Sequence, residues 1–227
     1  MRLDRSFFDR PVLEVAPDLL GCVVEHAAPD GTVAVRLTEV EAYAGAGDPG
    51  SHAFRGPGRR NGVMFGEPGH LYVYFTYGMH WCANLVCQPP GQPAAVLLRA
   101  GEVVAGEPVA RGRRPAARGS RDLARGPARL ARALGLRGGL DGLDACDPAG
   151  PVGVHRAGSA PVAPGVVRTG PRVGVSGAGA AFPWRFWLDG EPTVSAYRPH
   201  TPRRPRPGTA PRPVAAGGRG PGGDWAT

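Results

Sequence analysis

Thr32-Val-Ala-Val-Arg-Leu-Thr-Glu-Val-Glu-Ala-Tyr43 is the stretch from which the fold can be built outward. Its alternating β-branched and polar residues predict a long strand, because successive side chains in a strand point to opposite faces. Strict alternation places three apolar residues on one face with two carboxylates and a tyrosine: Val33, Val35, Leu37, Glu39, Glu41 and Tyr43. Such a face predicts a pocket wall. The alternative is a pair of carboxylates at a sheet edge, solvated or paired with arginines.

The flanking sequence predicts further strands and short helices. A turn at Pro29-Asp30-Gly31 links this strand to one over residues 22–26. Residues 71–76 and 79–86 alternate around Tyr77-Gly78, which predicts a hairpin. The other expected strands cover residues 96–99, 172–175 and 184–188, and the expected helices cover 11–20 and 127–134. Residues 106–121 look irregular and residues 138–170 look loop-rich. These elements predict an α+β fold with a mostly antiparallel sheet and helices around it.

Length and composition predict one globular domain with a tail. The chain has 227 residues and 42% hydrophobic content, enough to bury a core, and its 36 glycines and 26 prolines predict many turns. We expect a domain over residues 1–198 and a disordered Pro/Arg/Gly-rich tail over 199–227, which has too little apolar surface to order itself. No apolar run approaches a membrane span, and the N-terminus lacks the apolar core of a signal peptide, so a cytoplasmic location is expected.

The four cysteines do not predict a metal site. Cys22, Cys82, Cys87 and Cys146 show no C-x-x-C spacing, and Cys82 and Cys87 fall on opposite faces of a predicted strand. We therefore expect reduced, buried thiols and no bound metal.

The positive charge is concentrated in two stretches. All 27 basic residues are arginine, and nine of them lie in residues 111–137 against one acid, Asp122, for a local charge of +8. Residues after 199 add +4, which leaves −4 for the rest of the chain, whose total is +8. Concentrated basicity on an acidic body suits a polyanion such as nucleic acid. Base-composition bias in the gene, which enriches Arg, Ala, Gly and Pro together, is the alternative.

Aromatic and polar side chains gather in residues 38–84, where four of the five tyrosines lie. Tyr72 and Tyr74 share a strand face, and either could oppose Tyr43 to form a slot for a flat ring. Such a slot favours bases, and cationic bases further, by about 0.5–2 kcal/mol through cation–π attraction. A cross-strand aromatic cluster is the structural alternative. Tyr77, at the hairpin tip, is either a minor packing residue or a wedge that enters a stacked duplex.

In these residues the chain resembles the alkyladenine (3-methyladenine) DNA glycosylase family. The resemblance covers about Leu3 to Arg198. It is carried by Glu41-Ala-Tyr43, His52, Met64-Phe65, Leu71-Tyr-Val-Tyr-Phe-Thr-Tyr-Gly-Met79, Asn84, Leu97-Leu-Arg99, Gly126-Pro127-Ala-Arg-Leu130 and Arg172-Val-Gly-Val175. It implies a curved sheet with partial barrel closure and a bacterial, nucleoid-associated enzyme of base-excision repair. That enzyme would act as a monomer, without a cofactor, on double-stranded DNA containing damaged purines.

The resemblance also implies a role for each matching residue. Glu41 corresponds to the general base that activates water, and Tyr43 and Tyr74 correspond to the rings that sandwich the flipped base. His52 corresponds to the residue at the base edge, with a loop hydrogen bond as its alternative role. Tyr77 corresponds to the wedge that fills the gap in the stack. Glu39 receives no role.

Asn84, Arg99 and Val173 complete the implied site. Asn84 corresponds to the residue that crowds the exocyclic amine of normal guanine, unless it is only a buried strand amide. Arg99 and the Val173 carbonyl correspond to groups that hold the attacking water, although Arg99 could be a structural ion-pair partner. Four arginines are expected to contact the DNA backbone, mainly its phosphates: Arg59, Arg60, Arg129 and Arg132.

A single carboxylate suffices for this chemistry. An alkylated purine already carries positive charge, so its departure needs little help from an acid. The absence of lysine removes the usual amine for a Schiff base, so we expect hydrolysis without strand cleavage. A non-catalytic nucleic-acid binder and a small-molecule nucleosidase are the alternatives. Among 3-methyladenine, 7-methylguanine, hypoxanthine and etheno-adenine, the sequence favours none.

Overall fold

The computed structural model describes residues 1–158 and 162–200. Its helices are α1 (Arg5–Phe8), α2 (Val12–Asp18), α3 (Glu107–Arg113) and α4 (Pro127–Leu134). Its strands are β1 (Val23–Ala28), β2 (Gly31–Tyr43), β3 (Leu71–Thr76), β4 (His80–Cys87), β5 (Ala94–Ala105), β6 (Val152–His155), β7 (Val167–Gly170) and β8 (Arg185–Leu188). Beyond residue 200, the expected tail lies outside the described residues.

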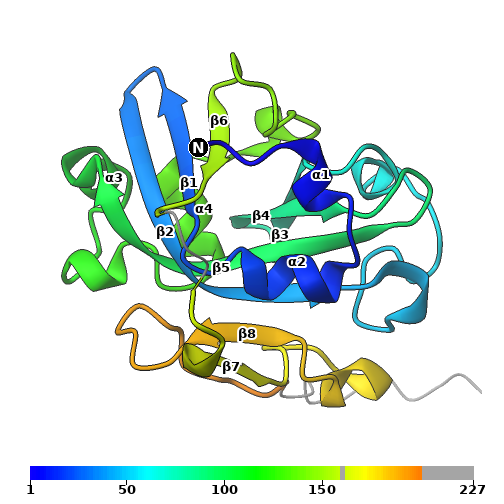
Figure 1. Cartoon of the computed structure of the whole chain (residues 1–227). Coiled ribbons are helices and arrows are strands. Elements are labelled where there is room, and N and C mark those ends of the chain that lie inside the picture. Colours follow the sequence, from blue (N-terminus) through cyan, green and yellow to red (C-terminus); the bar gives the residue numbers. More distant parts are fainter. Residues whose placement is uncertain (159–161, 201–227) are drawn as a thin grey trace, which may run out of the picture.

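The described strands form one antiparallel sheet, which confirms the expected α+β fold. Its main order is β3-β4-β5-β2-β1-β6, and β8 pairs with both β2 and β7. The sheet is strongly curved without closing, and the β7–β8 hairpin lies along one side of the body (Figure 1). Within the described part of the chain, no helix has the length and apolar character needed to cross a membrane.

Strand β2 is the centre of the sheet. β5 pairs along most of one edge of β2, while β1 pairs with the first half of the other edge and β8 with the second half. Between Leu37 and Glu39 the register with β5 shifts, which leaves Thr38 as an extra residue in a β-bulge. The buried hydrophobic core accordingly takes side chains from Val33, Val35 and Leu37 before the bulge and from Val40 and Ala42 after it.

The bulge corrects the face predicted for the carboxylates. Strict alternation placed Glu39, Glu41 and Tyr43 with the apolar residues of β2, and this was wrong. An extra residue reverses the alternation, so these three side chains lie on the face opposite the core. The core can therefore remain apolar while the same strand supplies a polar site.

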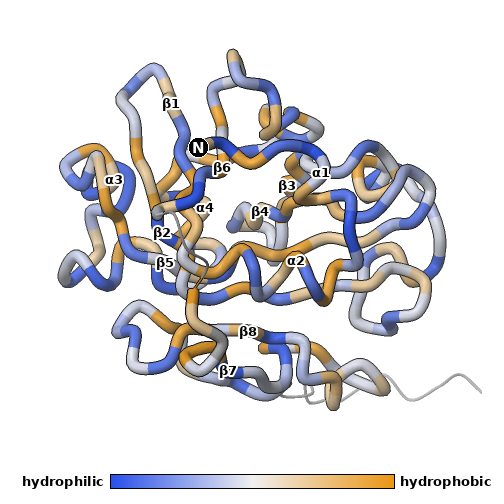
Figure 2. The backbone as a smooth tube through the Cα atoms, viewed as in Figure 1, coloured by the Kyte–Doolittle hydropathy of each residue, from blue (hydrophilic) through white to orange (hydrophobic). Residues whose placement is uncertain are grey.

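The hydrophobic core lies on the face of the sheet opposite Glu39, Glu41 and Tyr43. Helix α2 packs on β2 and β5, and α4 packs on β4 and β5. Helix α4 has the predicted bounds, with Pro127 in its first turn and Gly135 in a left-handed conformation after its end. Hydrophobic segments follow the strands and one side of α2, whereas many of the connecting loops are hydrophilic (Figure 2).

Four other predictions required correction or extension. Residues 106–121 contain α3, and the segment 138–170 contains β6 and β7, which are only four residues each and are defined by their partners. Residues 172–175 are not a strand: Gly174 has a φ of 75°, which interrupts extended backbone. The strand expected at 96–99 is the middle of the longer β5.

The β3–β4 hairpin is confirmed and carries strain at its tip. Tyr77 has a φ of 52° and Gly78 a φ of 68°, and the Met79 N–H donates to the Thr76 carbonyl. A left-handed conformation suits glycine but costs a tyrosine roughly 1–2 kcal/mol. The Tyr77 side chain is 83% exposed, so packing within the protein does not offset that cost.

Replacing Tyr77 with asparagine is expected to stabilise the fold. Asn-Gly is the preferred sequence for two successive residues of positive φ, so Tyr77→Asn should raise the free energy of unfolding by about 1 kcal/mol. Denaturant unfolding measures the change. His80→Asn provides the control, because His80 is equally part of the exposed hairpin end but has ordinary backbone. Equal effects of the two substitutions would contradict the assignment of strain to Tyr77.

Candidate active site

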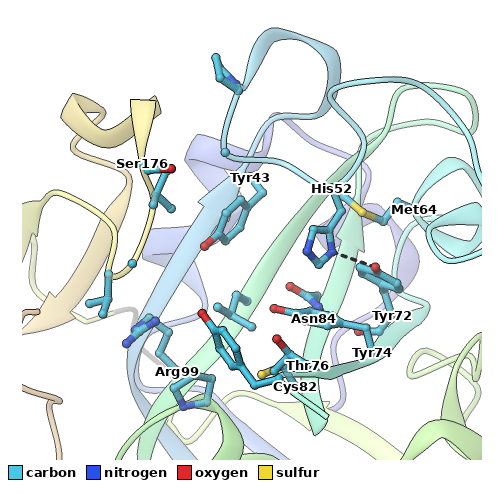
Figure 3. A pocket seen from close by; sticks show the side chains of 18 residues that line it. Tyr43, His52, Met64, Tyr72, Tyr74, Thr76, Cys82, Asn84, Arg99 and Ser176 are labelled. Atoms are coloured by element: carbon cyan, nitrogen blue, oxygen red, sulfur yellow. Dashed lines mark hydrogen bonds between the residues drawn. The ribbon is translucent and has the colours of Figure 1, made fainter. Parts of the chain in front are cut away.

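A cavity of about 350 Å³ opens between β2, the β3–β4 hairpin and the segment after Gly170. Six side chains or backbone groups that the sequence assigned to the site line it: Tyr43, His52, Tyr74, Asn84, Arg99 and Val173. Figure 3 shows Tyr43, His52, Asn84 and Arg99 surrounding the same space. Tyr77 also contributes to the lining, from the strained hairpin tip. The fold thus brings together residues that are up to 130 positions apart in the sequence.

The Glu41 carboxylate is fully buried beside this cavity, and its three hydrogen-bond partners line the cavity. Its Oε1 accepts a hydrogen bond of 2.7 Å from the Val173 N–H. Its Oε2 accepts one of 2.9 Å from the Tyr43 hydroxyl and one of 3.2 Å from Arg99. A carboxylate has about four lone-pair positions, so these bonds fix the orientation of the group and leave one position on Oε1.

Arg99 joins Glu41 to Glu39. Its Nε donates to Glu39 at 2.8 Å, and Glu39 also accepts from Arg185 at 2.7 Å and from the Ser195 N–H at 2.6 Å. The side chains of both arginines are at most 6% exposed and that of Glu39 is fully buried. Glu39, which the sequence left without a role, is therefore the centre of a buried ion-pair array. Arg99 takes part in this array and also lines the cavity.

Opposing effects set the ionisation of the array. Burial acts to raise the pKa of Glu39, but the charges of Arg99 and Arg185 and the Ser195 hydrogen bond together hold that pKa below its ordinary value. Burial acts to lower the pKa of Arg99, and the charges of Glu41 and Glu39 outweigh it and raise that pKa. Both groups are thus held in their charged forms.

Aromatic rings line the opposite side of the cavity. Tyr72 and Tyr74 stack at 5.4 Å between ring centroids, and the His52 ring meets Tyr74 edge-on at 4.7 Å. His52 Nδ1 lies 2.9 Å from the Tyr72 hydroxyl (Figure 3). Burial raises the pKa of Tyr72 to about 12 and that of Tyr74 further, so both rings keep their protons.

His52 lies at the mouth of the cavity with part of its side chain exposed. Packing of its ring against the two tyrosines nevertheless desolvates it. This desolvation is the larger cause and the positive charge of Arg60 the smaller one, and together they lower the pKa of His52 below its ordinary 6.5. His52 is therefore neutral at pH 7, and an uncharged edge is compatible with a positively charged ring in the cavity.

Comparisons with known proteins point to one family. The sequence profile described as methylpurine-DNA glycosylase matches residues 6–192. A protein of Streptomyces avermitilis is 61% identical over 204 residues, which cover 90% of this chain and 95% of the relative. A protein of Leifsonia xyli is 57% identical, with 86% and 92% covered, and one of Methanocella arvoryzae is 46% identical, with 87% and 97% covered. All three carry the name "Putative 3-methyladenine DNA glycosylase".

The chain belongs to the methylpurine-DNA glycosylase family. The resemblance stated from the sequence is thereby confirmed. Membership makes the protein a DNA-repair hydrolase that acts on N-glycosyl bonds.

The contacts of two further residues beside this cavity were not predicted from the sequence. Arg172 is 1% exposed, pairs with both carboxylate oxygens of Asp48, and stacks on Tyr43 with its guanidinium carbon 4.5 Å from the ring centroid. It joins the loop after β2 to the segment that carries Val173. Tyr72 holds His52. The only available signals were the place of Arg172 in the matched motif and the shared face of Tyr72 and Tyr74.

Asn84 and the four arginines lie in different settings. The Asn84 side chain is nearly buried, and its amide nitrogen donates to the Tyr72 carbonyl at 2.9 Å while the residue also lines the cavity. The arginines lie near the β3–β4 hairpin or on α4: Arg59 and Arg60 line a groove beside Phe75, Arg132 lines a second cavity beside Met79 and His80, and Arg129 pairs with Asp122.

Loss of the Glu39 charge is expected to destabilise the glycosylase strongly. Glu39→Gln leaves Arg185 without its carboxylate and Arg99 with only Glu41, and breaking a buried pair costs about 3–5 kcal/mol. Denaturant unfolding measures this cost. Glu102→Gln is the matched control: Glu102 pairs with Arg36 on the same two strands, but its side chain is 51% exposed, so that loss should stay below about 1 kcal/mol. A Glu39→Gln loss as small as the control's would rule out a structural role for the array.

Proposed function

We propose that the protein flips an alkylated purine, such as 3-methyladenine, out of duplex DNA and hydrolyses its N-glycosidic bond with a water activated by Glu41. The observation that carries this proposal is the Glu41 carboxylate, which is buried and fixed by three hydrogen bonds from residues that line the aromatic cavity. The catalytic unit would be residues 1–198. The names of the relatives support the choice of an alkylated adenine as substrate.

The cavity suits a flipped purine. Tyr43 comes from β2 and Tyr74 from β3, so a flat base between the two strands meets a ring on either side. His52 lies at its edge and Asn84, a neighbour of Tyr72 across β3 and β4, would crowd the exocyclic amine of normal guanine. Stacking and cation–π attraction both favour a positively charged alkylated ring in this slot.

The carboxylate would supply the remaining chemistry. Glu41 Oε1 retains a lone pair that can accept a proton from water as the water oxygen attacks the sugar carbon. The electrons of the broken N-glycosidic bond leave with the base and neutralise its positive charge. Arg99 and the Val173 carbonyl would hold the water, while the Glu41 charge stabilises the oxocarbenium-like sugar.

The hairpin tip and the arginines would manage the duplex. Tyr77 is exposed beside the cavity and can fill the gap left by the flipped nucleotide. Arg59, Arg60, Arg129 and Arg132 are proposed to contact phosphates. The chain contains no lysine, so a Schiff base could form only at the N-terminal amine, and we infer a glycosylase without lyase activity.

Glu41→Gln is expected to lower single-turnover release of 7-methylguanine from duplex DNA by at least about 100-fold, since a general base contributes 10²- to 10⁴-fold. Unchanged affinity for the same DNA verifies that the variant is folded. Activity that survives this change would rule out Glu41 as the base that activates the water. The wild-type product strand should stay intact until it is heated in alkali, and a borohydride-trapped DNA adduct would disprove the hydrolytic mechanism.

Acid should inhibit excision of a cationic lesion through His52. The folded-state pKa of His52 lies below 6.5, so His52 is neutral above that value and becomes charged as the pH falls through it. A charged His52 would repel 7-methylguanine. Wild-type excision should therefore decline between pH 7 and pH 5 more steeply than excision by His52→Gln, in which residue 52 cannot gain a proton. Parallel pH profiles of the two proteins would remove His52 from the pH response.

A further inference from the structure

Arg60 contacts the aromatic wall of the cavity from outside the cavity. Its guanidinium carbon lies 5.1 Å from the centroid of the Tyr74 ring, within the range of a cation–π contact. Its Nη2 donates to the Phe75 carbonyl at 2.6 Å, which holds the side chain against the edge strand β3. Arg60 does not line the proposed base slot, which Tyr74 lines. It lines a separate groove, together with Tyr74, Arg59 and Trp81.

An arginine stacks on each of the two rings of the slot, but a carboxylate neutralises only one of these arginines. Arg172 stacks on Tyr43, but Asp48 binds both of its terminal nitrogens, so the pair has no net charge. Arg60 stacks on Tyr74, and in residues 1–158 and 162–200 no carboxylate lies within ion-pair distance of it. The positive charge of Arg60 also acts on groups at the slot, since it contributes to the lowered pKa of His52 and opposes the raised pKa of Tyr72.

We propose that Arg60 is a specificity-determining residue that shifts the preference of the slot from cationic alkylated purines toward neutral damaged purines such as hypoxanthine. The proposal rests on the function proposed above, with Tyr74 as one wall of the base slot. It adds a second role to the phosphate contact that is proposed for Arg60.

The physical reason is competition for one ring. The electron-rich face of an aromatic ring attracts a cation, and a guanidinium already on Tyr74 draws on that electron density. A cationic base on the same wall meets a weakened ring and the direct repulsion of an unneutralised charge. A neutral base loses neither term, because its stacking depends on contact area rather than on its charge.

The test compares Arg60→Gln with Arg59→Gln. Both variants remove one exposed arginine charge from the same loop, but only Arg60 stacks on Tyr74. Single-turnover excision is measured on two duplexes that differ only in the lesion, 7-methylguanine or hypoxanthine. The same two substitutions are also made in a Glu41→Gln background, and the affinity of each resulting protein for both duplexes is measured. Binding reports on the slot even where catalysis is absent. Arg60→Gln should raise the ratio of 7-methylguanine to hypoxanthine excision rates, and the matching ratio of affinities, about threefold. Arg59→Gln should leave both ratios unchanged while the protein binds both lesion duplexes more weakly.

The outcomes separate the proposal from the function on which it rests. A wild-type protein that releases neither base overturns the proposed function, and the affinity ratios then decide the role of Arg60 alone. If Arg60→Gln weakens binding and excision of both lesions by the same factor, Arg60 is only a phosphate contact and the inference is overturned. An equal change of ratio in Arg59→Gln assigns the effect to overall loop charge and overturns it as well.

Discussion

The buried array of Glu39, Arg99, Glu41 and Arg185 is the constraint on which the rest of the structure depends. Two carboxylates from β2 meet two guanidinium groups from β5 and β8 with almost no access to water. Each charge would be costly to bury alone, so the array is favourable only when every member is paired. The three strands must therefore hold their registers closely, because a shift of one residue would remove a partner from the interior.

The bulge at Thr38 makes this array compatible with a hydrophobic core. Before it, β2 contributes odd-numbered apolar residues to the core; after it, the even-numbered Val40 and Ala42 take over, which frees Glu39 and Glu41 for the other face. Because Arg185 and Ser195 bind Glu39, the C-terminal part of the described chain is tied to the same point. Arg99, which helps to orient Glu41, is thus held by residues that do not line the cavity.

Local signals in the sequence were sufficient for elements that are determined locally. The Tyr77-Gly78 turn and the helix from Pro127 to Leu134 were predicted closely, because turn and cap chemistry act over a few residues. The bulge, the short strands β6 and β7, and the Arg172–Asp48 pair depend on partners distant in the sequence, and no local pattern specifies them. The residues gathered around the cavity were identified through family motifs, whereas the role of Glu39 required the three-dimensional pairing.

Charge balance gives a physical reason why, on the proposed function, contacts near the slot would control which base it prefers. The two carboxylates of the array are matched by two guanidinium groups, and Arg172 is matched by Asp48, so these buried groups carry no net charge. On the proposed function, Glu41 acts on the sugar, and a cationic base would be distinguished from a neutral one by the rings and by nearby unbalanced charge. Such charge lies on an exposed loop, which can change in sequence without disturbing the buried array. On the proposed function, catalytic geometry and lesion preference would therefore be carried by separate parts of the molecule.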